Sequence, residues 1–306
     1  MMSQIEQKID EIIVRISRIE KALNIVPDSE KTVSNLQSSI GEYEKFAKNE
    51  LNLEDITIRN QKSAILGFLE HSKGEINKDT VKDYLSSNDS PTWKTNQLKA
   101  LRRYFRDFLK LGNWIEEFDF SESKVRPKEI PSDDQLIEFF NLLPEQVQIV
   151  FLLLFTSGLR LGEIMSLRSC DIDFETNMID ASNTHSGKTK HSWISFFSQQ
   201  AREYLAEYME CNNKLEDPTI PIFSLSVRSV QQAFKNASYQ LGLSINPHLL
   251  RTIFVEKCTL AKIPDKYIDA FCGRVPQTVL AKNYTDYSPR SLRQQYDNVE
   301  TYLTLG

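Results

Sequence analysis

Residues 149–155, "IVFLLLF", form an uninterrupted apolar run near the middle of the chain. A helix without a polar stripe over this length has to be buried on nearly all sides, so the run predicts the centre of a hydrophobic core. Upstream, Ser132 is followed by Asp133 and Asp134. This is a helix-start pattern in which the acids lie in the first turn, where the helix dipole favours them. The sequence therefore predicts a domain over residues 132–306.

The composition is that of a soluble globular protein large enough for two domains. The chain has 306 residues, 40% of them apolar and 26% charged, and a chain of this length can build two cores. No apolar run approaches the length that crosses a bilayer, and the N-terminus is polar. We therefore expect no signal peptide, no membrane association and a cytoplasmic location.

The cysteines and histidines show no metal-binding spacing. The four cysteines include no CxxC pair and the four histidines no HxxxH pair, which favours a reducing compartment and argues against structural zinc. We expect neither a metal nor a cofactor. The net charge of −5 is weak evidence against a nucleic-acid partner, because a binding face is a local property.

Residues 1–30 carry a heptad pattern that ends at Pro27. The apolar positions alternate at spacings of four and three: Ile5, Ile9, Ile12, Ile16, Ile19, Leu23 and Val26. Such a narrow seam predicts a coiled-coil oligomerisation helix, and isoleucine at both seam positions favours three or four strands. The alternative is an amphipathic helix packed on its own domain.

Residues 31–118 predict a helical domain, and its fourth helical segment is basic. From Lys94 to Lys110 this segment holds six cations and one acid, Asp107, a local charge of +5. The cations are Lys94, Lys99, Arg102, Arg103, Arg106 and Lys110. They form either a solvated basic face or a surface that contacts phosphates. The polar, proline-bearing residues 119–131 predict a linker between the two domains.

Chemistry-bearing residues collect after the apolar run. Arg160, in "TSGLRLGEIM", lies at the junction between the buried helix and the next one, where a rigid element can aim it at an anion. The alternative is an ion pair with Glu163. Farther along, "NMIDASNTHSGKTKHSWISFF" predicts two short strands around a polar turn that holds Lys188 and Lys190.

A third group lies near the C-terminus. Pro247 can open a helix, and His248 and Arg251, three residues apart, then project from one face of it. An imidazole beside a guanidinium makes an acid–base group next to an anion clamp. The segment "CGRVPQTVLAKNYTDYSP" follows, with Arg274, Tyr284 and Tyr287.

The order of these motifs resembles the tyrosine recombinase family, the phage-integrase and Xer-like site-specific recombinases. An arginine box, a lysine hairpin, "HLLR" and "GRVPQTVLAKNYTD" follow one another over about residues 130–290. Residues 31–118 more loosely resemble that family's helical core-binding domain. The ending is more similar to integrases of archaeal mobile elements than to bacterial Xer proteins. The resemblance implies a mainly α fold with a small β-hairpin or sheet in the catalytic domain.

The resemblance also implies roles for individual residues. The first arginine falls on Arg160, the hairpin lysine on Lys188 with Lys190 as the alternative, and the HxxR pair on His248 and Arg251. The nucleophile falls on Tyr284, while Tyr287 packs or contacts the backbone. One departure is Arg274, which stands where the family has His or Trp, with a spacing to the tyrosine one residue longer. An arginine can still donate to a phosphate oxygen, so Arg274 is expected among the catalytic residues. Glu163 is expected to orient Arg160.

The chemistry so implied is the cutting and rejoining of DNA without metal or ATP. The two arginines would neutralise the phosphate, His248 would take the proton of Tyr284, and Lys188 would protonate the leaving 5′ oxygen. The product is a phosphotyrosine on a DNA 3′ end. The expected partners are double-stranded DNA with a specific target site and further copies of the chain, as a tetramer on DNA. The expected DNA contacts are Lys94, Lys99, Arg102, Arg103, Arg106 and Lys190.

Two other functions remain open from sequence. One is nicking and resealing like a type IB topoisomerase, which uses a similar tyrosine site. The other is a DNA-binding protein on a decayed recombinase scaffold, which the departure at Arg274 would allow. The C-terminal segment from Pro289 predicts an amphipathic helix that docks on its own domain or on a neighbour.

Overall fold

The computed structural model describes residues 40–122, 129–182, 193–274 and 283–305. The chain divides into two compact units, Met1–Pro127 and Lys128–Gly306, with the division inside the segment expected to be a linker. The expected coiled coil of residues 1–30, both hairpin lysines and residues 275–282 before the expected nucleophile lie outside the described residues.

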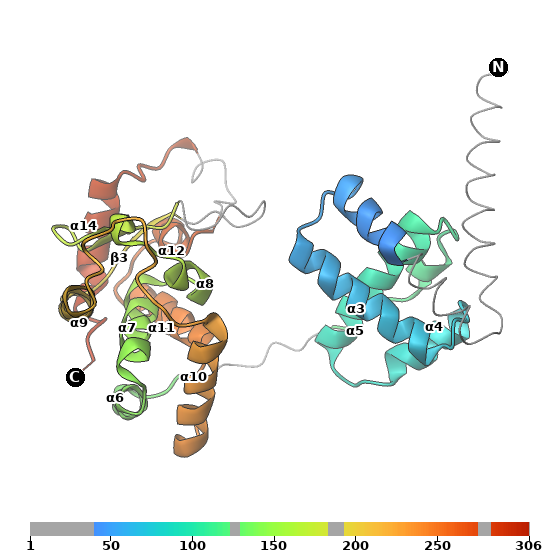
Figure 1. The fold of residues 1–306 in the computed structure, drawn as a ribbon, viewed down its shortest axis with the longest axis horizontal. Helices are drawn as coiled ribbons and strands as arrows, with labels where there is room; N and C mark the ends of the chain where they lie inside the picture. The colour runs from blue at the N-terminus through green and yellow to red at the C-terminus, as the bar shows by residue number, and fades with distance from the viewer. Residues whose placement is uncertain (1–39, 123–128, 183–192, 275–282, 306) are drawn as a thin grey trace. The chain divides into compact units, whose positions relative to one another are not determined.

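The first unit is helical in its described part (Figure 1). Residues 40–49 are helical and are followed by α3 (Asp55–His71), α4 (Lys78–Ser86), α5 (Pro91–Arg102), the π-helix η1 (Arg103–Phe108) and the 3-10 helix η2 (Trp114–Glu117). Local signals explain two of the starts. The side chain of Asn77 accepts the N–H of Thr80 to cap α4, and Pro91 opens α5 behind the Ser90 cap.

The basic segment changes its winding where it was expected to continue as one α-helix. α5 ends at Arg102, and η1 continues with wider π turns, shown by the bond from Leu109 N–H to the Tyr104 carbonyl at 2.9 Å. The π turns place Tyr104 and Phe108 in an aromatic core, where both rings lie within 6 Å of the Tyr43 ring. Packing of these aromatic rings thus fixes which side of the segment carries its cations.

The second unit is built around one buried helix (Figure 1). Its elements are α6 (Asp133–Asn141), α7 (Glu145–Ser157), α8 (Leu161–Met165), η3 (Ser169–Asp171), β1 (Ile172–Asp173), β2 (Met178–Asp180), β3 (Ile194–Phe196), α9 (Gln199–Cys211), α10 (Val227–Leu241), α11 (Pro247–Leu260), α12 (Asp265–Phe271) and α14 (Pro289–Glu300). The apolar run lies on α7, between α9 and α11, and every residue from Ile149 to Ser157 is buried. This confirms the expected centre of the core.

A three-stranded antiparallel sheet with order β1-β2-β3 lies beside this core. The expected pair of strands appears as β2 and β3, in a register that places Ile179 opposite Ser195. The additional strand β1 pairs with β2. The protein is therefore mainly α-helical with a small sheet in its second unit, as expected. Within the described ranges, no helix is long and apolar enough to cross a membrane.

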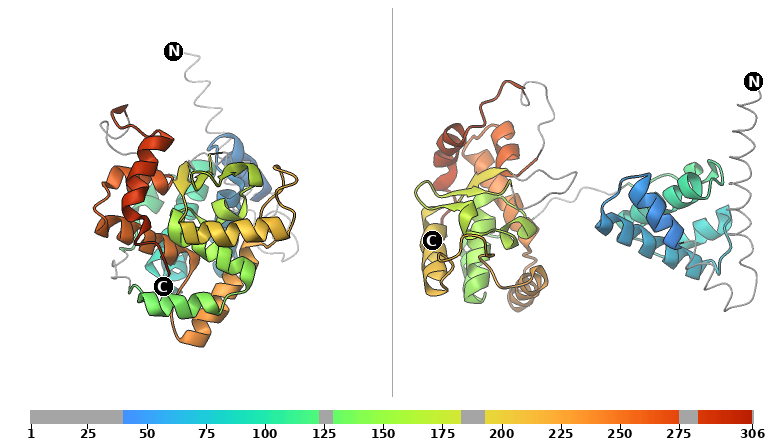
Figure 2. Two further views of the ribbon diagram at one scale, coloured as in Figure 1. Left: turned by 90° about the vertical axis from the view of Figure 1, so that its left-hand side faces the viewer. Right: turned by 45° about the horizontal axis from the view of Figure 1, so that its top comes forward.

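The C-terminal helix α14 packs on its own unit, against β3 (Figure 2). Leu292, Tyr296 and Val299 are fully buried, and the Tyr296 hydroxyl donates to the Thr156 carbonyl at 2.8 Å. Burial raises the pKa of Tyr296 well above its usual value, so the phenol stays neutral. Of the two places expected for this helix, the structure shows the one on its own domain.

Gly158 ends α7 in the left-handed region, at φ 68°. Only glycine adopts this conformation without strain. Space is equally restrictive, because a Cβ at this position would lie 2.4 Å from Cδ1 of the buried Phe254. The tight turn lets α11 pack directly against the end of α7.

We expect Gly158→Ala to destabilise the second unit by roughly 2–4 kcal/mol, since left-handed strain adds to overpacking. Urea unfolding followed by tryptophan fluorescence measures this change. Gly242→Ala is the matched control: Gly242 ends α10 at φ 64° with no atom within 4 Å of the added Cβ. It should lose only the strain, about 1 kcal/mol. Equal losses at the two glycines would show that contact with Phe254 does not matter.

Candidate active site

Arg251 connects three elements of the second unit. It projects from α11 and is 4% exposed. Its Nη1 donates to the carbonyl of Gly158 at 2.7 Å, and its Nη2 donates to the carbonyl of Cys272 at 2.5 Å. The end of α7 and the end of α12 therefore both hold this guanidinium.

Arg160 is held by a carboxylate from the same turn. It occupies the cap position of α8, and Glu163 on that helix is fully buried. Glu163 accepts from Nη1 of Arg160 through one oxygen and from the Arg160 backbone N–H through the other, both at 2.6 Å. An acid in the first turn also suits the helix dipole. The ion pair is thus present, and its geometry is that of an orienting contact.

These arginines accumulate positive charge in a place partly closed to water. Burial lowers the pKa of Arg251, and the charges of Arg160 and Arg274 lower it further, although a guanidinium remains protonated at neutral pH. Glu163 pairs with Arg160, and Asp269 pairs with Arg274 at 3.0 Å. The three arginines and these two carboxylates together carry a net charge of one positive unit, which favours binding of an anion.

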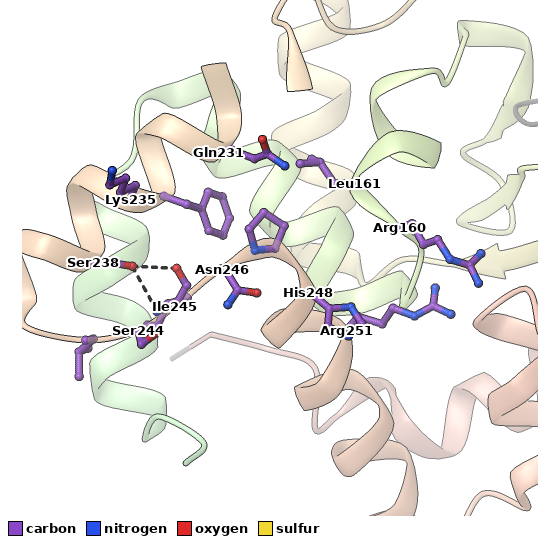
Figure 3. A pocket seen from close by; sticks show the side chains of 13 residues that line it. Arg160, Leu161, Gln231, Lys235, Ser238, Ser244, Ile245, Asn246, His248 and Arg251 are labelled. Carbon is purple, nitrogen blue, oxygen red and sulfur yellow. Dashed lines mark hydrogen bonds between the residues drawn. The ribbon is translucent and has the colours of Figure 1, made fainter. Parts of the chain in front are cut away.

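Arg160, His248 and Arg251 line one groove of about 660 Å³ (Figure 3). Figure 3 shows the two guanidinium groups pointing to the same side. His248 is exposed and lies one turn before Arg251 on α11, whose start is capped by Asn246. The expected juxtaposition of imidazole and guanidinium on one helix face is therefore present.

Helix α10 forms the other wall of this groove, with Gln231, Lys235 and Ser238 (Figure 3). The sequence alone indicated no role for this helix. The available signal was its amphipathic pattern, in which Val230, Phe234 and Ala237 are buried and polar residues lie between them. An amphipathic pattern shows which side of a helix faces solvent, but it does not show which other residues or ligands that side contacts.

The two tyrosines have different environments. The side chain of Tyr284 is 78% exposed and is not part of the groove lining. Tyr287 packs against the core, with its ring edge-on to Tyr267 at 6.2 Å between centroids, as expected for the tyrosine that packs. Lys188 and Lys190 lie outside the described residues. It therefore stays a prediction that Tyr284 and one of these lysines lie in the same active site as Arg160 and Arg251.

A second polar groove lies between α3 and α5 in the first unit. Its lining includes Asn60, Asn96, Gln97, Lys99 and Arg103. Amide and cationic side chains together are typical of surfaces that contact bases and phosphates. Lys94 lies on the same helix but is not part of the lining.

Two of the expected DNA-contacting arginines are already paired. Arg102 and Arg106 both form ion pairs with Glu116 of η2, and Arg106 also pairs with Asp107. The guanidinium of Arg102 also lies 4.3 Å from the centre of the Phe120 ring. The positive charge available for DNA is therefore smaller than the local charge of +5, because Glu116, which lies outside the segment, pairs with two of its arginines.

A model of the phage integrase family matches residues 129–290, more than half of the chain. Tyrosine recombinase XerA of Saccharolobus solfataricus is 31% identical over 134 residues, covering 43% of this chain and 44% of that protein. XerA of Thermococcus onnurineus is 26% identical over 174 residues, covering 51% and 57%. The chain thus spans about half the length of these two relatives. XerC of Staphylococcus aureus is 23% identical over 280 residues, covering 82% and 92%.

The fold is shared with solved structures of integrases bound to DNA. A dimer of lambda integrase residues 75–356 bound to a COC′ core site matches with a TM-score of 0.62 at 19% identity, covering 83% of this chain and 96% of that one. The Tn1549 transposon integrase in complex with transposon right-end DNA matches with a TM-score of 0.61 at 16% identity, covering 85% and 99%. The motif order, the arginine-lined groove and the match over residues 129–290 agree: the chain belongs to the phage integrase family.

Proposed function

We propose that this protein is a site-specific DNA recombinase that cuts and rejoins duplex DNA through a 3′-phosphotyrosine intermediate. The observation that carries the proposal is the pair Arg160 and Arg251, whose side chains line one groove with an exposed histidine and whose guanidinium groups are held by Glu163 and by the Gly158 carbonyl. A site with surplus positive charge and fixed planar donors fits the non-bridging oxygens of a phosphodiester. Family membership and the DNA-bound fold relatives support it.

The chemistry begins with attack by a phenol. His248 takes the proton of Tyr284 as the Tyr284 oxygen bonds to phosphorus and the bond to the 5′ oxygen breaks. Arg160 and Arg251 stabilise the charge that builds up on the non-bridging oxygens. Lys188, or alternatively Lys190, gives a proton to the leaving 5′ oxygen. The phosphotyrosine keeps the energy of the broken bond, so a 5′ hydroxyl from another strand can reverse the step without ATP.

We place DNA contacts on both units. Lys99 and Arg103 line the groove between α3 and α5 and are the strongest candidates in the first unit. Lys94, Arg102 and Arg106 are weaker candidates, because Lys94 lies outside the groove and the arginines have acidic partners. Lys190 is assigned to DNA by motif alone.

We also propose a domain order and an assembly. Residues 1–30 would be a coiled-coil helix, 31–118 the core-binding domain, 119–131 the linker and 132–306 the catalytic domain, acting in the cytoplasm as a tetramer on DNA. A lambda integrase tetramer bound to a Holliday junction has the same fold, with a TM-score of 0.62 at 17% identity. Sedimentation of the chain on a synthetic four-way junction tests the tetramer, and a monomer there would contradict it.

Tyr284→Phe should abolish the covalent protein–DNA adduct on a nicked suicide substrate, because it removes the attacking oxygen. Tyr287→Phe is the matched control and should keep the adduct, since the Tyr287 ring packs against the core and its hydroxyl has no partner among the described residues. Denaturing gel electrophoresis of labelled DNA measures both.

The same assay separates the rival functions. No adduct from the unmodified chain on its target site would indicate a decayed DNA-binding protein. Adducts and relaxation on any supercoiled plasmid, without a specific site, would indicate topoisomerase-like activity. Adduct loss in Tyr287→Phe instead of Tyr284→Phe would show that the wrong nucleophile has been assigned.

Lys99→Ala and Arg103→Ala should each reduce the slope of log affinity against log salt by about one, because each would release one counterion fewer. Fluorescence anisotropy with labelled duplex over a series of salt concentrations measures the slope. Lys82→Ala, on an exposed part of α4 outside the groove, is the control and should leave the slope unchanged. Equal slopes for Lys82→Ala and Lys99→Ala would remove the groove from the DNA-binding surface.

A further inference from the structure

The chain leaves α12 by a turn that fixes the position of Arg274. Gly273 has a φ of 56°; its N–H donates to the Ala270 carbonyl at 2.9 Å, and the N–H of Arg274 donates to the Asp269 carbonyl at 2.8 Å. These two bonds are the Schellman arrangement. In that arrangement the residue after the left-handed one lies beside the residue five positions earlier, where an apolar contact is common.

An ion pair replaces the apolar contact here. Nη1 of Arg274 lies 3.0 Å from Oδ1 of Asp269. Asp269 stands in the last turn of α12, where the helix dipole disfavours a negative charge. Because both side chains are partly exposed, the pair adds little to stability. An acid at position 269 therefore does not stabilise the helix. It does hold the side chain of Arg274 in one direction.

The same turn also supports Arg251. The carbonyl of Cys272, between the end of α12 and Gly273, accepts from Nη2 of Arg251. Arg274 lies near enough for its charge to act on Arg251. A single short turn thus carries both Arg274 and a carbonyl that holds the buried arginine of the groove.

We propose that Asp269 is the positioning residue for Arg274 and holds its guanidinium toward the phosphate that Arg160 and Arg251 bind. This inference rests on the proposed function. Asp269 acts only through Arg274 and does not touch the DNA. The arrangement parallels the first arginine, where Glu163 fixes Arg160 from within one turn. An arginine held in this way would donate to the phosphate from a position where the family has His or Trp.

A double-mutant cycle on the rate of adduct formation tests the coupling. With saturating suicide substrate, Arg274→Ala should slow the single-turnover rate about 100-fold, as loss of one transition-state donor does. Asp269→Asn, which keeps the size of the side chain, should slow it about 10-fold through misplacement of Arg274. The double variant should be no slower than Arg274→Ala alone, because the two residues act through one contact.

A second readout separates positioning from a general structural effect. A methylphosphonate at the scissile position lacks the charge that Arg274 meets, so the defects of Asp269→Asn and Arg274→Ala should shrink on it. A loosened fold would slow both substrates alike. The control Asp265→Asn removes a carboxylate from the first turn of the same helix and should leave the rate unchanged. Thermal unfolding of Asp269→Asn should match that of the unmodified chain.

Each other outcome overturns the inference. Asp269→Asn at the unmodified rate would show that Asp269 does not matter, and a faster rate would show that it competes with the phosphate for Arg274. A double variant slowed by the product of the single effects would show independent roles. If the unmodified chain forms no adduct, the proposed function fails and the inference fails with it; an active unmodified chain leaves the function standing whatever Asp269→Asn does.

Discussion

A buried guanidinium fixes the candidate site. Arg251 donates to backbone carbonyls 93 and 21 positions away in the chain. A buried charge without hydrogen-bond partners is costly, so the fold has to bring the ends of α7 and α12 to this side chain. Both ends are left-handed glycine turns, at Gly158 and Gly273, which expose the carbonyl groups that Arg251 needs.

The same contacts explain how a strongly cationic site persists without DNA. Glu163 compensates Arg160, Asp269 compensates Arg274, and backbone carbonyls alone support Arg251 among the bonds described. The partial compensation keeps the arginines apart and directed while leaving positive charge for a phosphate. Donors that are placed before the substrate arrives need little rearrangement during the reaction, which is the main source of electrostatic catalysis.

Local sequence signals predicted the elements and the motif positions well. The apolar run identified α7, Ser132 identified the start of α6, and Pro247 identified the start of α11 with His248 and Arg251 on one face. These features depend on neighbours within a few residues, which periodicity and capping patterns record. The order of the motifs then identified the family.

Long-range contacts were not predictable in this way. The residues around Arg102 in the sequence do not indicate its ion pair with Glu116. The residues around Arg251 likewise do not indicate its hydrogen bond to the carbonyl of Gly158. Hydrophobic periodicity does not distinguish α from π winding, so the change at Arg103 was missed as well. Such contacts arise from how packed elements meet, which a linear pattern does not encode.

Arg251 is fixed before DNA binds, and side-chain NMR of the arginines in the DNA-free chain tests this claim most directly. The terminal guanidinium hydrogens of Arg251 should give separate signals that exchange slowly with water, because both ends of the group donate to buried carbonyls. Arg228, exposed on α10, provides the internal reference and should give averaged, rapidly exchanging signals. Averaged signals from Arg251 like those of Arg228 would contradict the claim.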